Sequence, residues 1–308
     1  MNITSLVAQQ VFIMLVLILT GFVLYKKSVI TPVGTKDISG LLLNIVTPCV
    51  LIKAYQIEYS PEIVKELLLA FVLSILIHGL YIVAAGLIWR FNKNKEKRIS
   101  EVFSCVYSNC GFMGIPLLSA TLGDKGVLLG SAYLAVFNVL VWTHGLCTYG
   151  GSAKLISAKN LLKNPGVLGV SIALVLFFVR VKIEGPVKDI IGYFASLNTP
   201  LAMLLLGCYL ARSDLKKAFS ESGIYIVSFI KLLLFPLATA LLFSAMRIES
   251  FLATTLVLTA ACPAAAIAPI FAEKFDMDTG YPSQIVSVTT LLSVLTLPVA
   301  AYLFSFIL

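Results

Sequence analysis

Long apolar runs constrain this chain more than any other feature of its sequence. Val7 to Leu24 and Leu67 to Trp89 carry no Asp, Glu, Lys or Arg, and each is close to the roughly 20 residues that an α-helix needs to cross a bilayer. Because the hydrocarbon core holds no water, only helices or closed barrels can span it. The runs lack the alternation of apolar and polar residues that barrel strands show. The sequence therefore predicts an all-α integral membrane protein.

Composition supports the same fold class. Hydrophobic residues make up 59% of the chain, charged residues only 12%, and the mean hydropathy is +0.98, unlike an ordinary soluble domain. The formal net charge of +8 suggests no nucleic-acid partner, because basic residues at the ends of membrane helices set topology. The six cysteines form no C-x-x-C pair and lie at no metal-ligand spacing from histidine. We expect neither a metal site nor a cofactor.

Ten helices are predicted, at residues 5–25, 36–55, 62–91, 100–122, 123–149, 165–181, 187–211, 221–246, 249–272 and 279–306. One set of alternate loops, including Lys93–Arg98, Lys154–Lys163 and Arg212–Lys217, carries most of the lysines and arginines. Basic residues of this kind are retained in the cytoplasm. We therefore predict a multi-pass protein of the cell (plasma) membrane with both termini on the extracytoplasmic side.

Two landmarks recur with a period of about half the chain. Leu43-Asn44-Ile45-Val46-Thr47-Pro48 is echoed by Leu197-Asn198-Thr199-Pro200, 152 positions later at the prolines, and Pro116 is echoed by Pro269, 153 positions later. Five helices per copy is an odd number, so the second copy must be inverted in the membrane. The prediction is one membrane domain over residues 1–308, with repeats at about 1–150 and 160–308, an arrangement typical of secondary transporters.

The fourth and ninth predicted helices each contain helix-breaking residues. Asn109 to Pro116 holds two glycines and a proline, and Cys262 to Pro269 holds two prolines. Because Pro116 lacks an N–H and its ring clashes with the preceding turn, the helix is expected to break there. Freed backbone groups at mid-depth are tolerated only where they are buried or line a wet cavity, and half-helix N-termini favour an anion. The alternative is a pair of kinks that only shape packing.

The stretch Tyr107-Ser108-Asn109-Cys110-Gly111-Phe112-Met113-Gly114-Ile115-Pro116-Leu117, followed by Asn138 and Trp142, resembles the auxin efflux carrier family, which includes plant auxin exporters and bacterial malonate and malate permeases. The resemblance implies ten helices in two inverted five-helix repeats, as in bile-acid sodium symporters and sodium/proton antiporters. Broken helices four and nine would cross beside the substrate, and a transport domain would slide like an elevator. Asn109 matches the crossover asparagine that meets the substrate carboxylate, and Asn138 matches a polar position facing it.

We predict an anion site between the two breaks, formed by Asn109, Gly111, Gly114, Asn138, Cys262 and Pro263. Amide side chains can hold a carboxylate without adding charge, so the anion can also leave. A second set should support the crossover or hold a coupled cation, and it comprises Asn44, Thr47, Asn198 and Thr199 beside Pro48, Pro116, Pro200 and Pro269.

Lys231 is the one charged residue predicted near the middle of a span. An ionisable residue there is costly and suggests a function: Lys231 could replace a bound cation, balance the substrate charge or carry a proton. The alternative is a lysine that snorkels or caps broken-helix carbonyls. His78 and His144 could shuttle protons, although packing roles are favoured. All fifteen acidic residues are predicted at helix ends or in loops, which argues against a paired-carboxylate antiporter.

The predicted function is transport of a small organic anion, either a dicarboxylate such as malonate or malate or, less favoured, an auxin-like aromatic acid. No Ser-His-Asp group, H-E-x-x-H motif or P-loop is present, so neither an enzyme nor an ATP-driven pump is predicted. The alternatives are a sodium-coupled symporter of the bile-acid type and, in another class, a membrane receptor or passive channel, which the repeat disfavours. Coupling to sodium or protons and assembly as a homodimer are left open.

Overall fold

The computed structural model describes residues 3–152, 154, 156 and 164–308, and this part of the chain is helical apart from its loops and one isolated bridge between two residues. Lys159 and Lys163, which the topology prediction uses, lie outside the described residues. The first half contains α1 (Ile3–Lys26), α2 (Pro32–Leu41), η1 (Leu42–Val46), α3 (Thr47–Ala54), α4 (Pro61–Ile88), α5 (Lys95–Val106), η2 (Cys110–Gly114), α6 (Ile115–Thr121), α7 (Gly123–Leu140), η3 (Val141–Gly145) and α8 (Leu146–Gly150), where η marks π-helix. The second half contains α10 (Pro165–Phe178), α11 (Gly185–Ser196), α12 (Asn198–Arg212), α13 (Leu215–Ser220), α14 (Ser222–Phe229), η5 (Ile230–Leu234), α15 (Phe235–Ala245), α16 (Ser250–Ala260), α17 (Ala268–Lys274) and α18 (Gly280–Ile307).

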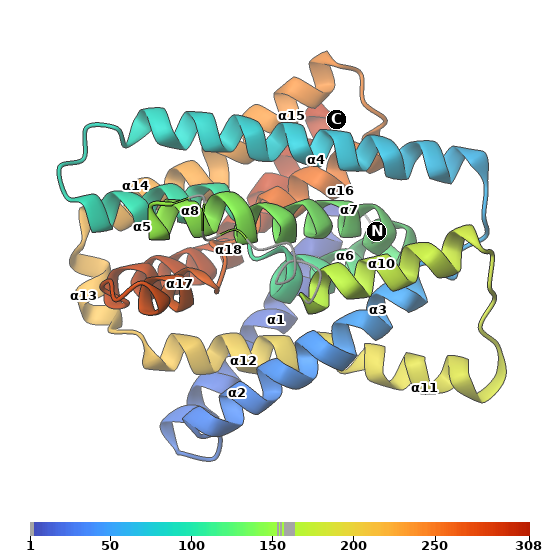
Figure 1. The fold of residues 1–308 in the computed structure, drawn as a ribbon, viewed down its shortest axis with the longest axis horizontal. Coiled ribbons are helices and arrows are strands. Elements are labelled where there is room, and N and C mark those ends of the chain that lie inside the picture. The colour runs from blue at the N-terminus through green and yellow to red at the C-terminus, as the bar shows by residue number, and fades with distance from the viewer. Residues whose placement is uncertain (1–2, 153, 155, 157–163) are drawn as a thin grey trace.

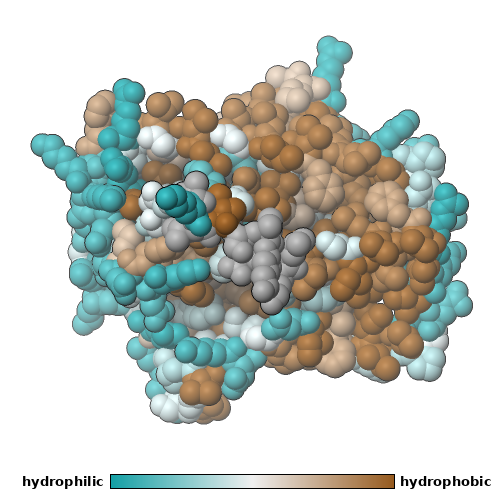
Figure 2. Space-filling view, viewed as in Figure 1, coloured by the Kyte–Doolittle hydropathy of each residue, from teal (hydrophilic) through white to brown (hydrophobic). Residues whose placement is uncertain are grey.

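Among the described residues, seven continuous helical stretches are long and apolar enough to cross a membrane. Three shorter apolar helices accompany them, at Cys110–Thr121, Pro165–Phe178 and Ser250–Ala260. Figure 2 shows apolar residues spread over a broad central region of one face, with hydrophilic residues gathered toward the two ends. The predicted class, an all-α membrane protein, is confirmed, whereas the ten-span topology and the orientation of the termini remain predictions.

Side-chain caps define where several helices begin. Thr31 accepts a hydrogen bond from the backbone N–H of Gly34 at the start of α2, and Ser60 accepts one from Ile63 at the start of α4. Each cap is followed by a proline at the first helical position, where a missing N–H costs nothing. Because of its cap, α2 begins at Pro32, four residues before the predicted start at Lys36.

The start of α5 corrects a prediction about the acidic residues. Asn94 accepts a hydrogen bond from Lys97 N, so α5 begins at Lys95 rather than at Ser100. Glu101 therefore lies inside a helix and is buried, contrary to the expectation that every acidic residue sits at a helix end or in a loop. Its carboxylate accepts hydrogen bonds from Tyr281 Oη at 2.8 Å and Asn92 Nδ2 at 2.7 Å.

Three of the π-helical turns precede a proline. The turns η1, η2 and η5 end two residues before Pro48, Pro116 and Pro236. A proline removes one helical hydrogen bond and its ring crowds the preceding turn; a locally widened turn accommodates that ring without ending the helix. The prediction that the helix breaks at Pro116 is therefore wrong in position, because the break lies at residues 107–109 and Pro116 sits inside the second half-helix.

The helices form two packed groups. In the first, α1 packs along α12 and α10 packs along α3, with α2 and α11 beside them. The second contains α4 to α8 and α13 to α18, and the two groups meet where α1 packs on α18 and where α3 and α10 pack on α7. Figure 1 shows α2, α3, α11 and α12 along the lower side of the molecule and α4, α14, α15 and α16 along the upper side. The boundary between the groups positions the candidate site.

The backbones of α1 and α12 touch where two glycines meet. A Cβ atom on Gly207 would lie 2.0 Å from the carbonyl oxygen of Ile18, and one on Gly21 would lie 2.2 Å from the carbonyl oxygen of Leu204. Cys208 Sγ also lies 3.7 Å from the Gly21 carbonyl oxygen. Small residues allow this approach, which is how membrane helices gain packing energy without a hydrophobic driving force.

We predict that Gly207→Ala lowers the thermal unfolding midpoint of the detergent-solubilised protein, because the added methyl group must push two backbones apart. The expected cost is about 1–3 kcal/mol. The matched control is Gly86→Ala in α4, where no described atom beyond the neighbouring residues and backbone of its own helix lies within 4 Å of the new Cβ and the change favours helix. Equal midpoints for the two variants would contradict the close packing of α1 and α12.

Candidate functional site

Two non-helical segments cross near the centre of the molecule. The first follows α5 and the second follows α16, and they pair in antiparallel fashion at Ser108 and Ala264. Asn109 N donates to the carbonyl oxygen of Pro263 at 2.7 Å, and Ala265 N donates to that of Tyr107 at 2.9 Å. Because unpaired backbone groups are costly away from water, these reciprocal bonds let both helices break inside the apolar region.

Lys231 caps the carbonyl end of one broken helix. Its side chain is fully buried, and Nζ donates to Ser108 Oγ at 2.5 Å and to the carbonyl oxygen of Ala260, the last residue of α16, at 3.2 Å. Ser108 Oγ also donates to the Ala260 carbonyl oxygen at 3.0 Å. Neither ion pair found in the described part of the chain involves Lys231. The geometry matches the capping alternative, in which a cation meets the negative end of a helix.

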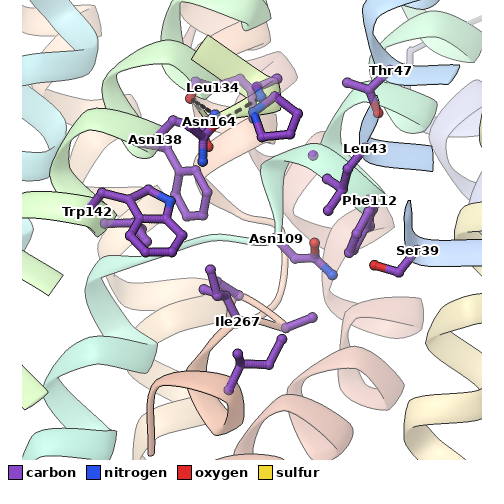
Figure 3. Close-up of a pocket in the computed structure, with 18 of the residues that line it drawn as sticks. Ser39, Leu43, Thr47, Asn109, Phe112, Leu134, Asn138, Trp142, Asn164 and Ile267 are labelled. Carbon is purple, nitrogen blue, oxygen red and sulfur yellow. Dashed lines mark hydrogen bonds between the residues drawn. The ribbon is translucent and has the colours of Figure 1, made fainter. Parts of the chain in front are cut away.

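A cavity of about 240 Å³ lies beside the crossover, between the two helix groups. Residues of α2, η1, α3, α10 and α12 line one side, and residues of η2, α7, η3 and the segment before α17 line the other. None of the described lining residues is charged, and the polar side chains among them are Ser39, Thr47, Asn109, Asn138, Trp142, Asn164 and Tyr209. Figure 3 shows Asn109 below the pair formed by Asn138 and Asn164.

Asn109 offers an unused donor at this cavity. The residue is only 4% exposed, and Nδ2 has no hydrogen-bond partner among the described residues. Buried polar groups are nearly always paired, and an unpaired one carries a desolvation cost. Asn109 also stands directly before η2, whose first-turn residues Gly111 and Phe112 line the same cavity. The arrangement suits a ligand that accepts hydrogen bonds.

Asn138 lies where the two groups meet. Its Nδ2 donates to the carbonyl oxygen of Leu134 at 2.8 Å, within its own helix. A Cβ on Gly166 would lie 2.6 Å from that nitrogen, so the absence of a side chain at Gly166 lets α10 approach α7. Asn164 Oδ1 accepts from Gly166 N and Val167 N and so caps the start of α10.

The structure places the other predicted site residues in three ways. Gly111 and Thr47 line the cavity. Gly114, Cys262 and Pro263 are buried at the crossover behind the lining, where a Cβ on Gly114 would lie 3.6 Å from Cys262 Sγ. The rest lie away from the cavity. Asn44 is exposed, and its Nδ2 donates to the carbonyl oxygen of Gly40, while Pro48 packs on Gly169. The first turn of α12 contains Asn198, Thr199 and Pro200, and the first turn of α17 contains Pro269.

The two histidines lie in hydrogen-bonded packing positions outside the cavity lining. His78 is fully buried, with Nδ1 2.8 Å from the carbonyl oxygen of Ser74 and its ring beside that of Tyr133. His144 Nδ1 lies 2.9 Å from Tyr107 Oη. Neither histidine is among the residues that line the cavity, and His78 Nε2 has no hydrogen-bond partner among the described residues.

Sequence reasoning missed four residues that the structure brings to the site. Ser39, Asn164 and Tyr209 line the cavity, and Ser108 binds Lys231. Asn164 carried a usable signal, since an asparagine before a proline is typical of a helix start. Ser39 and Tyr209 carried no such signal in the sequence, because they reach the cavity only through the packing of helices that are distant in sequence.

Comparison with known proteins identifies the family. A family model described as "Membrane transport protein" matches residues 6–159 and 152–301. An uncharacterized transporter of Methanothermobacter thermautotrophicus is 24% identical over 94% of this chain and 96% of its own length. The uncharacterized transporter YfdV of Escherichia coli K12 is 25% identical over 94% of each chain, and YfdV of Shigella flexneri matches equally. The chain therefore belongs to this membrane transport family, the auxin efflux carrier family that its fourth-helix motif resembles.

Proposed function

We propose that this transporter carries a small organic anion, and that the carboxylate binds in the cavity beside the crossover. The observation that carries the proposal is the unpaired amide of Asn109, which faces an uncharged cavity at the start of a half-helix. An amide nitrogen and the free N–H groups of a helix N-terminus are both hydrogen-bond donors. A carboxylate would accept from both.

The charge balance of the crossover supports an anion. The helix ends that meet there carry opposite partial charges, and Lys231 adds a full positive charge at the carbonyl end of α16. No carboxylate lies among the described residues of the cavity lining. Ser108, which binds Lys231, is adjacent in sequence to Asn109, which lines the cavity. An anion in the cavity would therefore meet no carboxylate in the described lining, and a buried cation lies behind that lining at the crossover.

The cavity also restricts the size of the solute. A volume of about 240 Å³ falls just below the range of about 300–1,000 Å³ that is usual for small-molecule sites. Phe112, Phe137 and Trp142 contribute apolar walls beside the amides. This size limit suits a small dicarboxylate, which is our first candidate, and the aromatic walls also suit a compact aromatic acid, which is the second candidate within the same class.

Movement of one helix group against the other would give alternating access. In an inverted repeat, α1 corresponds to α10 and α3 corresponds to α12, so the α1–α12 contact in one copy corresponds to the α10–α3 contact in the other. Both contacts are present, in agreement with the landmark spacing in the sequence. The cavity lies at the boundary of the two groups rather than inside either. Sliding of the group that contains the crossover would carry the bound anion across the membrane.

The direct test of the function is uptake of radiolabelled organic acids by proteoliposomes. We expect small dicarboxylates to be taken up and to exchange with unlabelled substrate across the membrane, which a receptor does not do. Uptake measured with and without sodium and pH gradients shows whether transport is coupled to sodium or to protons. The absence of both uptake and counterflow for dicarboxylates and aromatic acids alike would contradict the proposal.

Asn109→Ala separates substrate binding from folding. Because Nδ2 has no partner in the described part of the chain, its removal should leave the unfolding midpoint nearly unchanged, while the bound carboxylate loses a donor worth about 1–3 kcal/mol. The apparent KM should rise accordingly. The matched control is Asn44→Ala, an exposed asparagine bonded within its own helix. An unchanged KM for Asn109→Ala would place the anion elsewhere.

Lys231→Met tests the charge balance. The variant keeps most of the side-chain volume and removes the ammonium group, so the apparent KM for a dicarboxylate should rise about tenfold, equivalent to about 1.4 kcal/mol. Loss of the cap on Ala260 should also lower the unfolding midpoint, so KM is measured on the folded, monodisperse fraction. Lys188→Met, at an exposed position in α11, is the control. A stable Lys231→Met protein with unchanged KM contradicts the electrostatic role.

A further inference from the structure

We propose that a second pocket, at one end of the molecule, binds the phosphate headgroup of an anionic phospholipid. The pocket has a volume of about 220 Å³ and lies between the segment after α3, residues 55–59, and the segment after α10, residues 180–182. Figure 1 shows the α3–α4 and α10–α11 connections together at the right end of the molecule. This site is separate from the cavity at the crossover and does not depend on the proposed function.

Three side chains that carry hydrogen-bond donors line the second pocket, namely Gln56, Arg180 and Lys182. Gln56 Oε1 accepts from Ile183 N at 2.7 Å, which ties the two segments together, while Gln56 Nε2 is buried and has no partner among the described residues. Arg180 and Lys182 line the pocket, and neither forms an ion pair in the described chain. Glu58 also borders it, which leaves one net positive charge. An amide and two cations suit a phosphate group.

Arg180 occupies a backbone position that favours glycine. Its φ angle is +58°, and the bonds from Arg180 N to Phe177 O and from Val181 N to Leu176 O form the left-handed turn that ends α10. A side chain in this conformation costs free energy that glycine would not. The guanidinium lies over the Tyr59 ring, 4.1 Å from its centroid, and so is held at the pocket. Arg247 ends α15 in the same conformation, so the feature that distinguishes Arg180 is a guanidinium positioned over Tyr59 at the pocket.

The position of the pocket at the ends of the membrane spans favours a lipid as the source of the phosphate. Candidate spans end at Ala54 and begin at Pro61 and Gly185, so the pocket lies where helices leave the apolar region. Beside it, α10 presents exposed Val175, Phe178 and Val179 on one face. A headgroup in the pocket would place its acyl chains along this apolar face, and a tyrosine-arginine pair is typical of the membrane interface.

Native mass spectrometry of the full-length protein in uncharged detergent tests the assignment. Phosphatidylglycerol and phosphatidylcholine with identical acyl chains are added to the wild type, Arg180→Gly and Arg247→Gly. We expect the wild type to prefer phosphatidylglycerol and Arg180→Gly to bind it about tenfold or more weakly, as loss of a charged hydrogen-bond donor implies. Because glycine relieves the left-handed strain, Arg180→Gly should unfold at the same temperature as the wild type or higher.

Arg247→Gly is the matched control. Arg247 has a φ angle of +55° and ends α15 through the same turn, yet it lines neither pocket. Equal loss of phosphatidylglycerol in both variants would mean diffuse charge attraction and would overturn the site, as would unchanged binding in Arg180→Gly. Inorganic phosphate alone serves as the third arm: if it raises the unfolding midpoint through Arg180 as much as the lipid does, the ligand is a free phosphate and the lipid assignment fails.

Discussion

The fold depends on two backbone hydrogen bonds between segments about 150 residues apart. Asn109 N to Pro263 O and Ala265 N to Tyr107 O satisfy the groups that two broken helices expose where water is absent. With these bonds in place, helix ends can meet inside the apolar region. Lys231 and Ser108 then satisfy the carbonyl end of α16. The irregular backbone is therefore satisfied by the pairing of the two breaks together with the side chains of Lys231, Ser108 and Thr289, whose Oγ1 accepts a hydrogen bond from Ala264 N.

The extended backbone at the crossover separates structural from binding roles. Successive side chains of an extended segment point to opposite sides, and this alternation is visible in two neighbours. Ser108 contacts Lys231, Tyr133 and the carbonyl of Ala260, whereas Asn109 lines the cavity with its amide nitrogen unpaired. One residue thus maintains the crossover and the next is available to a ligand. In our account, the adjacency of Ser108 and Asn109 places the charge of Lys231 near the substrate. No direct ion pair forms, so the anion is not trapped.

Features that depend on local sequence were predictable, and features that depend on packing were not. Apolar runs gave the membrane helices, and the motif around Asn109 indicated a break, although its position was wrong because a π-helical turn accommodates Pro116. Pro263 contributes its carbonyl to backbone pairing, and both it and Cys262 lie behind the cavity. Ser39 and Tyr209 reach the cavity only through the packing of α2 and α12, which no local pattern encodes.

On the mechanism proposed here, a carboxylate binds between the crossover and the opposing helix group. A structure of the protein with bromomalonate, whose bromine identifies the ligand unambiguously, tests this most directly. We predict carboxylate density within hydrogen-bond distance of Asn109 Nδ2 and the backbone amides of Gly111 and Phe112, which line the cavity, with the bromine in the same cavity. A transported bromomalonate whose density lies in another part of the molecule would contradict the account.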